Sequence, residues 1–173
     1  MAAVISDSSP LIYLAWLGHF DLLRQLYAQL VVPAAVWDEV ALRGGSLPGA
    51  GELRAAVQAG WLTVETPTKP LTPEELAGAE VDIGEIQAIA LAIERGTVLI
   101  IDDLDGRRLA RRLGVEVTGT IGVLVRAKRQ SLIPALRPLV GRLRRETNFH
   151  VSGPLINATL ADLGEPPLGT ESE

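Results

Sequence analysis

The sequence predicts an α/β fold in which a mostly parallel sheet lies between two layers of helices. Short apolar, β-branched runs alternate with helical patterns, and the connections between them are short. The clearest run, Val98–Ile101, is apolar throughout, which is typical of a strand buried on both faces. With 173 residues, of which 47% are hydrophobic, the chain can form a substantial core. We therefore expect one domain over residues 1–163 and a disordered tail over residues 164–173.

Five segments have the short, apolar composition of strands. They are Ala2–Ser6, Leu30–Val32, Trp61–Glu65, Val98–Ile101 and Val115–Val117. The segment around Trp61 is the most polar of the five, so we expect it at an edge of the sheet.

Apolar residues at helical spacing fill the intervals between the strands. Ser8 or Ser9 is expected to cap the first helix, with Pro10 at its first position. Thr72 and Asp82 are expected to cap two later helices, and glycine follows most of the patterns. The predicted helices cover residues 11–17, 20–29, 33–43, 52–59, 82–95, 104–113, 118–129, 134–145 and 152–163, with a further helix start at 72–75.

Charge is distributed unevenly along the chain. The formal net charge is −5, composed of −10 over residues 1–106, +10 over residues 107–145 and −5 over residues 146–173. A basic segment in an acidic protein could guide a polyanion towards an acidic centre. The same arginines could instead be solvated helix faces that pair with acids elsewhere in the fold.

Composition excludes several kinds of site. The absence of cysteine excludes disulfides, thiolate zinc sites and a cysteine nucleophile. The two histidines lie in unrelated contexts, and no GxxxxGK[ST], GxGxxG or GxSxG motif is present. No apolar run is long enough to cross a bilayer, and the N-terminus lacks the basic region of a signal peptide, so we expect a cytoplasmic protein without membrane association.

Acidic residues follow two of the predicted strands where each strand ends. Asp7 follows the first strand, and Asp102 and Asp103, with Asp105 close by, follow the fourth. Because the carboxyl ends of parallel strands meet at one edge of a sheet, these side chains should face the same crevice. Crowded carboxylates repel one another unless a cation neutralises them. Asp7 could instead serve only as a helix cap.

Two helices can bring further acids to the same edge. Glu85 lies in the first turn of its helix, where the helix dipole alone would also stabilise a carboxylate. Either Asp38 or Glu39 could face the sheet edge, although both could be ordinary surface charges. Oxygen ligands without histidine or cysteine favour Mg²⁺ or Mn²⁺, and such a centre suits displacement at phosphorus.

Five motifs together resemble the PIN-domain ribonucleases, in particular the VapC-like toxins with a GTxG turn. They are VISDSSPLIYL, VVPAAVWDEV, GEIQAIALA, LIIDDLDGRRLARRLG and VTGTIGVL, in that order over nearly the whole chain. The resemblance implies a PIN-like α/β/α sandwich and a Mg²⁺- or Mn²⁺-dependent endoribonuclease acting on RNA. It further implies the toxin of a toxin–antitoxin pair, inhibited by a small antitoxin protein and often a homodimer.

The resemblance also implies roles for individual residues. Asp7, Glu85 and Asp103 would be the main metal-site carboxylates, and Asp102 and Glu39 would contribute directly or through water. Ile101 stands where many relatives have Thr or Ser, so Asp102 and Asp103 compete for the direct role, with Asp105 in reserve. Thr120 and Ser8 would hydrogen-bond a ligand carboxylate or a phosphate. The expected phosphate-binding group, part of which could instead dock the antitoxin, is Arg107, Arg108, Arg111 and Arg112.

Two other functions fit the sequence. One is a non-catalytic PIN-like module that binds RNA or protein. The other is a Mg²⁺-dependent phosphatase-like enzyme with Asp7 as nucleophile, although that chemistry usually needs a nearby lysine and the only lysines are Lys69 and Lys128.

Overall fold

A computed structural model describes residues 3–169 of the chain. The chain divides into two compact units, residues 1–120 and residues 121–173. The first unit contains the whole sheet and every predicted site acid, and the second is helical. Ala2 of the first predicted strand and residues 170–173 of the predicted tail lie outside the described residues. Across residues 3–169, each helix is too short or too polar to traverse a lipid bilayer.

The first unit is built on a five-stranded sheet with the order β3-β2-β1-β4-β5. All four pairings are parallel, so the predicted α/β fold with a parallel sheet is confirmed. The polar strand around Trp61 lies at an edge, as expected. The strands are β1 (Val4–Ser6), β2 (Leu30–Pro33), β3 (Leu62–Glu65), β4 (Leu99–Ile100) and β5 (Val117–Thr118).

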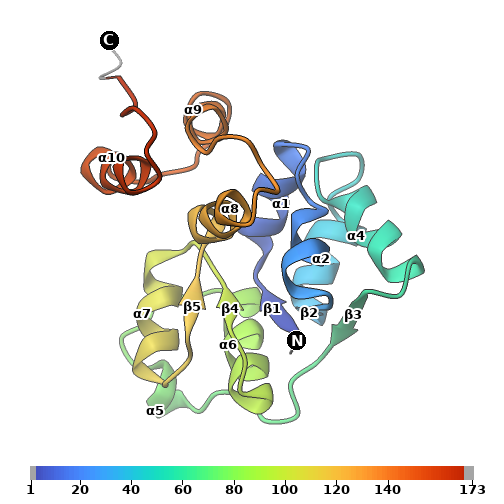
Figure 1. The fold of residues 1–173 in the computed structure, drawn as a ribbon. Helices are drawn as coiled ribbons and strands as arrows, with labels where there is room; N and C mark the ends of the chain where they lie inside the picture. Colours follow the sequence, from blue (N-terminus) through green and yellow to red (C-terminus); the bar gives the residue numbers. More distant parts are fainter. Residues whose placement is uncertain (1–2, 170–173) are drawn as a thin grey trace. The chain divides into compact units, whose positions relative to one another are not determined.

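Helices cover both faces of this sheet (Figure 1). The chain moves outward from β1 to β3 and then crosses back to β4, so right-handed connections place the helices of the two halves on opposite faces. On the first face lie α1, α2 and α4, and on the second lie α6 and α7. The helices of this unit are α1 (Ser8–Trp16), α2 (Leu22–Tyr27), α3 (Ala34–Trp37), α4 (Ala50–Gln58), α5 (Pro73–Leu76), α6 (Ile83–Arg95) and α7 (Leu104–Arg112).

An aliphatic core joins the sheet to α6 and α7. The buried run Ala88–Ala92 of α6 packs in one cluster with Ile5, Leu99 and Leu109. The expected caps hold this layer in place, because Asp82 caps α6 and Gly96, with φ of +58°, ends it in the left-handed conformation. The helix that presents Glu85 is therefore fixed at both ends.

The predicted helix over residues 33–43 is interrupted in the structure. After α3 the chain widens into a π-helical turn, η1 (Asp38–Leu42), in which the Arg43 amide donates to the Asp38 carbonyl. An i→i+5 turn changes the direction of the side chains that follow it, and π turns are frequent at functional sites. Apolar periodicity alone does not distinguish this turn from a continuous α-helix.

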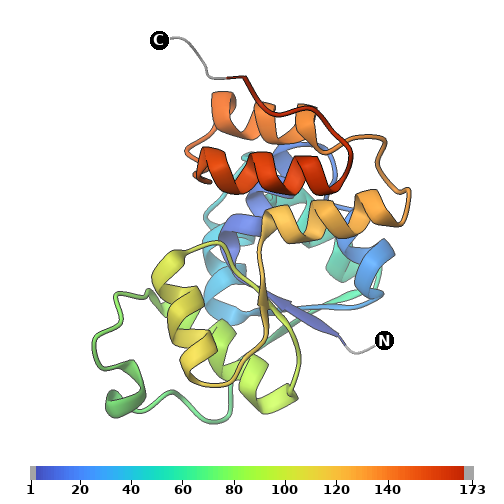
Figure 2. The same ribbon diagram turned by 60° about the vertical axis from the view of Figure 1, so that its left-hand side comes forward.

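The second unit consists of helices (Figures 1 and 2). Its helices are α8 (Thr120–Arg129, of which Thr120 belongs to the first unit), α9 (Arg137–Glu146) and α10 (Gly153–Asp162). The described part of the predicted tail is attached to α9, since the Glu165 carboxylate accepts from the Leu136 and Arg137 amides at 2.8 and 2.7 Å. The Leu168 amide also donates to the Asn157 side chain.

Candidate metal centre at the carboxyl edge of the sheet

The predicted acids meet where the strand order of the sheet reverses. β1 lies between β2 and β4, so the crevice between β1 and β4 is the point at which the connections diverge to opposite sides. The Asp7 amide donates to the Ile100 carbonyl at 2.9 Å, which brings Asp7 level with the residues that follow β4. Asp7 and the Asp102–Asp103 pair therefore flank one crevice, as the sequence predicts.

Asp7 is buried without a capping role. It occupies the N-cap position of α1, but its side chain makes no capping hydrogen bond, and the expected caps Ser8 and Ser9 are instead the first two residues of the helix. The prediction of a serine cap is thus wrong, because the helix begins at Ser8, two residues before the expected first position at Pro10. The pKa of Asp7 is raised from 3.8 to about 8. Burial is the main cause, the Ser8 amide opposes it, and the charges of Glu85, Asp82 and Glu39 add to the rise.

Glu85 is held beside Asp7 by a reciprocal capping box. The Asp82 amide donates to Glu85 Oε2 at 2.8 Å, and the Glu85 amide donates to Asp82 Oδ1 at 2.9 Å. The pKa of Glu85 is raised to about 7. Burial is the main cause, the Asp82 amide opposes it, and the charges of Asp103 and Asp82 add to the rise. Gly84 permits this approach, since a Cβ there would lie 3.3 Å from Asp82 Oδ1 and 3.6 Å from Asp7 Oδ1.

Asp82 was expected only as a helix cap, and the structure adds it to the acidic group. Its charge acts on both Asp7 and Glu85. The signal was present in the sequence, because a capping box places the N-cap acid and the glutamate three residues later on the same turn.

Asp102 and Asp103 have different surroundings although they are adjacent. Asp103 is exposed, caps α7 through the Gly106 amide at 2.8 Å, and lies close enough to Glu85 to raise its pKa. Asp102 accepts from the Thr120 amide at 2.7 Å and from the Thr120 hydroxyl at 2.5 Å. Thr120 therefore donates hydrogen bonds to a carboxylate of the predicted site, and such a bond was one of the two contacts expected for it.

Arg107 completes the surroundings of Asp102. Its guanidinium donates to the Ile101 carbonyl at 2.9 Å. Burial raises the pKa of Asp102, and Thr120 and the charge of Arg107 oppose this rise. A Cβ on Gly119 would lie 2.6 Å from Asp102 Oδ1 and 2.8 Å from Arg107 Nη1, so this close packing depends on glycine. Tyr13 is a second residue that the sequence analysis did not assign to the site. Burial and the nearby charge of Asp102 raise its pKa, so it lies within the influence of the acidic group.

Of the two acids on the π turn, Glu39 faces the site. The Ser8 hydroxyl donates to Glu39 Oε2 at 2.7 Å, and the Glu39 charge acts on Asp7. Asp38 instead forms an exposed ion pair with Arg43 at 3.3 Å. The structure thus separates two neighbours that the sequence left as alternatives.

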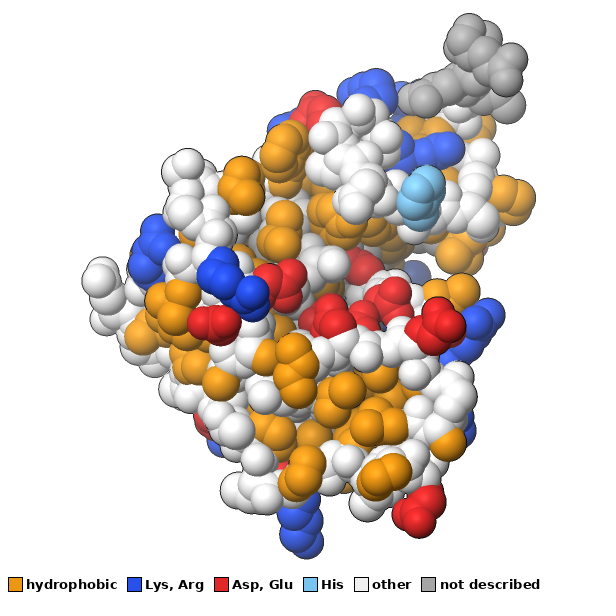
Figure 3. All heavy atoms as spheres, turned by 180° about the vertical axis from the view of Figure 1, so that it is seen from behind, with side chains coloured by type: hydrophobic (Ala, Val, Ile, Leu, Met, Phe, Trp, Pro, Cys, Tyr) orange, Lys and Arg blue, Asp and Glu red, His pale blue; other side chains and the backbone are white. Residues whose placement is uncertain are grey.

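The acidic group is the polar exception in an apolar interior. Within residues 3–169 the buried polar or charged side chains are Ser6, Asp7, Ser8, Glu85 and Thr120, all at this edge of the sheet. Figure 3 shows acidic side chains gathered in one region of the surface. Buried carboxylates without a cationic partner are costly, so their concentration at one place indicates a functional site.

The sequence matches one family model over nearly its whole length. The family model DUF3368, described as a PIN domain, matches residues 3–165. The chain belongs to this PIN domain family. PIN domains are generally nucleases, and this PIN domain is accordingly assigned to that broad class.

Two solved archaeal structures are similar to this PIN domain. One is a PilT N-terminus domain protein from Sulfolobus solfataricus P2, with 20% identity, a TM-score of 0.48 and coverage of 88% of this chain and 100% of that one. The other is a domain of a functionally unknown protein from Methanocaldococcus jannaschii, with 19% identity, a TM-score of 0.47 and coverage of 69% and 91%. No curated protein matches the sequence.

PIN-domain nucleases generally use divalent metal ions, and the donors of this PIN domain suit such an ion. Asp7, Glu85 and Asp103 supply only carboxylate oxygens, which hard divalent cations prefer. Among the described residues no group of three or more acidic, histidine or cysteine side chains is already spaced to hold a metal. Asp7, Glu85 and Asp103 are the residues that would hold such an ion, and Asp7 and Glu85, whose pKa values are raised, would have to be deprotonated to do so.

Other predicted site residues lie apart from the acids. Asp105 pairs with Arg108 at 3.3 Å on an exposed face of α7. Arg112 donates to the Glu75 and Ala77 carbonyls at 2.5 and 3.3 Å and so holds the segment at α5. Arg111 is exposed, which leaves Arg107 as the arginine of the predicted four that contacts the acidic group.

Proposed function

We propose that this PIN domain is a Mg²⁺- or Mn²⁺-dependent endoribonuclease that hydrolyses RNA phosphodiester bonds at the carboxyl edge of its sheet. The observation that carries the proposal is the burial of Asp7 and Glu85 beside other carboxylates, with the pKa of each raised into the neutral range. A site that destabilises its own charged groups in this way is suited to binding a cation.

The surroundings of each site residue suggest a different role for it in the proposed reaction. Asp7, Glu85 and Asp103 would hold the ion, because none of them has a cationic partner among the interactions that shape their surroundings. Asp102 keeps the loop after β4 in position through Thr120 and Arg107. Glu39, fixed by the Ser8 hydroxyl, can accept a proton from an attacking water. A bound Mg²⁺ or Mn²⁺ supplies charge neutralisation at phosphorus and water activation.

The proposal extends to a biological role. The motifs of the chain resemble VapC-like toxins, including the Gly119–Gly122 turn that contains Thr120. We therefore propose a cytoplasmic toxin that a small antitoxin protein inhibits, in a pair of the VapBC type, with a homodimer as the expected assembly.

A phosphatase-like mechanism has less support. Lys128 donates to the Pro134 carbonyl, and Lys69 lies in the loop beside Glu94, so neither described lysine accompanies Asp7. Arg107 is the cation beside the acidic group, and it is engaged with the Ile101 carbonyl.

The test is RNA cleavage by the purified chain with Mg²⁺ or Mn²⁺ and with EDTA. We expect internal cleavage of single-stranded RNA with metal, and none with EDTA or with Glu85→Gln. A phosphomonoester assay run in parallel identifies phosphatase activity. RNA binding without cleavage under any metal condition would instead favour the non-catalytic module.

A further inference from the structure

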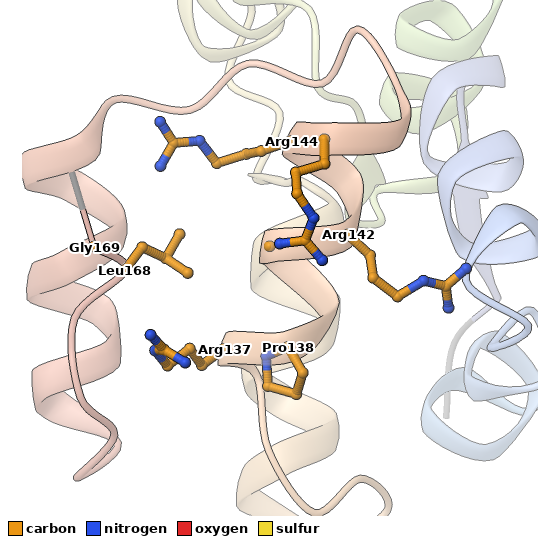
Figure 4. A pocket seen from close by; sticks show the side chains of 8 residues that line it. Arg137, Pro138, Arg142, Arg144, Leu168 and Gly169 are labelled. Atoms are coloured by element: carbon orange, nitrogen blue, oxygen red, sulfur yellow. The ribbon is translucent and has the colours of Figure 1, made fainter. Parts of the chain in front are cut away.

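The second unit contains a cavity of about 460 Å³ on α9. Arginine dominates its lining, which comes from α9 and from the extended segment after α10 (Figure 4). The lining residues of α9 are Arg137, Pro138, Gly141, Arg142, Arg144 and Arg145, and those of the extended segment are Leu168 and Gly169. None of these residues belongs to the acidic group at the sheet edge.

Helical geometry and one glycine create this cavity. Residues 137, 141, 144 and 145 are spaced to lie on one face of α9, with Gly141 in the middle. A Cβ at Gly141 would lie 3.1 Å from Arg145 Nη1 and 3.9 Å from Leu168 Cδ2. The missing side chain therefore provides the space over which the Arg145 guanidinium lies.

The arginines of the cavity differ in how their charges are used. The Arg142 guanidinium pairs with the Glu146 carboxylate at 3.2 Å, and in Figure 4 its side chain points away from the extended segment. Arg137 donates through Nε to the Pro167 carbonyl at 3.0 Å, which anchors the segment. Within residues 3–169, Arg144 and Arg145 have no hydrogen-bond or ion-pair partner, and both are exposed. The guanidinium groups of these two consecutive residues are thus available to anions.

The shape and charge of the cavity favour a nucleotide unit over a simple anion. Guanidinium forks match phosphate oxygens, and Pro138 and Leu168 offer apolar surface to a ribose or base. Residues 121–173 carry a net charge of +2, whereas residues 1–120 carry −7. An RNA substrate of a metal nuclease needs basic contacts beyond the acidic centre, because that centre alone repels phosphates.

We propose that this cavity binds a nucleotide unit of the RNA substrate, with the two phosphates that flank it on Arg144 and Arg145. This assignment rests on the proposed ribonuclease function, and it adds a substrate contact outside the acidic centre.

The test measures binding of a short fluorescent single-stranded RNA by anisotropy, in EDTA, so that cleavage plays no part. We expect Arg144→Gln/Arg145→Gln to weaken RNA binding about tenfold. The slope of the logarithm of the binding constant against the logarithm of the salt concentration should become shallower by roughly 1.4, the value for two phosphate contacts on a single strand. The matched control, Arg24→Gln/Arg129→Gln, removes the same charge from exposed positions outside the cavity and should lose clearly less. Gly141→Ala keeps every charge and displaces the Arg145 guanidinium, so an intermediate loss is expected.

If the cavity and control variants lost equal RNA affinity, the loss would reflect only the net charge of the protein, and the proposal would be overturned. Unchanged RNA binding in the cavity variant would also overturn it, as would binding of a glutamate-rich peptide, instead of RNA, that depends on Arg144 and Arg145. Thermal unfolding of each variant checks that the fold is intact. If the wild-type chain binds RNA through this cavity but cleaves nothing with metal, the nuclease proposal fails and the binding site stands.

Discussion

Two neighbouring parts of the acidic edge surround their carboxylates with different groups, although burial raises the pKa of the carboxylates in both. At Asp102 the hydroxyl and amide of Thr120 and the charge of Arg107 oppose that rise. Asp7 and Glu85 lie among other acids, and burial raises the pKa of each to about 8 and about 7. We therefore expect the first carboxylate to hold the loop after β4, and the other two to bind a ligand that the chain does not itself provide.

Removing the charge of Asp7 tests this contrast most strongly. We expect Asp7→Asn to reduce metal-dependent RNA cleavage by at least about 10²-fold, the order expected for loss of one charge-stabilising group. The same variant should be more stable than the wild type in EDTA at pH 8, since an uncompensated buried charge disappears. Kinetic assays and thermal unfolding measure the two effects.

Asp21→Asn is the matched control for this experiment, because it removes an exposed carboxylate that accepts a hydrogen bond from the Gln25 side chain, away from the acidic group. Full cleavage activity in Asp7→Asn would contradict the assignment of Asp7 to the metal centre.

The pH dependence of stability gives a second test. In the folded protein Asp7 and Glu85 keep their protons to higher pH than in the unfolded chain, so the folded state binds more protons between about pH 4 and pH 8. The stabilisation is complete below the unfolded pKa values and is lost as the pH rises through the folded ones. Relative to Asp7→Asn, the metal-free wild type should therefore lose on the order of a few kcal/mol between pH 5 and pH 8.

Urea unfolding of both proteins at several pH values measures this difference. Addition of Mn²⁺ at pH 8 should restore part of the lost stability in the wild type alone. Parallel stability curves for the two proteins would show that Asp7 ionises normally.

Removing a hydrogen-bond donor of Asp102 should lower the stability of the protein, whereas removing the charge of Asp7 should raise it. Thr120→Val removes the hydroxyl that donates to Asp102 in a fully buried position, and we expect a loss of roughly 1–3 kcal/mol in the free energy of unfolding. Thr120→Ser keeps the hydroxyl and should retain most of this stability. A Thr120→Val variant as stable as Thr120→Ser would mean that Asp102 does not need this donor.

The smallest effect is expected at Asp105, the third acid after β4. Its exposed ion pair with Arg108 contributes little in water, so Asp105→Asn should change the free energy of unfolding by no more than about 0.5 kcal/mol. Cleavage should stay within about twofold of the wild type. A large loss of activity would place Asp105 in the metal centre and weaken the contrast drawn above.

Local sequence signals predicted the parts of the site that depend on strand ends and helix starts. A buried strand followed at once by acids placed Asp7 and Asp103 correctly at one edge, because parallel strands all end there. The capping box at Asp82 and Glu85 was also readable, although its consequence for Asp7 needs the packing of α6 across the sheet. These features are determined by residues close together in the chain.

The remaining features depend on contacts that sequence patterns do not encode. Arg112 looked like a phosphate contact, but its guanidinium bonds the backbone carbonyls at α5, some 35 residues away in the chain. The choice between Asp38 and Glu39 depends on the π turn, which apolar spacing does not distinguish from an α-helix. The cavity on α9 depends on the return of residues 167–169 to that helix, in a segment expected to be disordered.

The direction in which the Glu39 side chain points depends on the number of residues in the π turn at Asp38–Leu42. Each residue of an α-helix turns the chain by about 100°, so a single deletion that restored regular winding would rotate the side chains on one side of it by that angle relative to those on the other. Val40 and Ala41, now inside, and Glu39, now bonded to Ser8, could not all keep their places. Insertions and deletions here would thus be more damaging than most substitutions, even though Asp38, Glu39 and Leu42 are exposed.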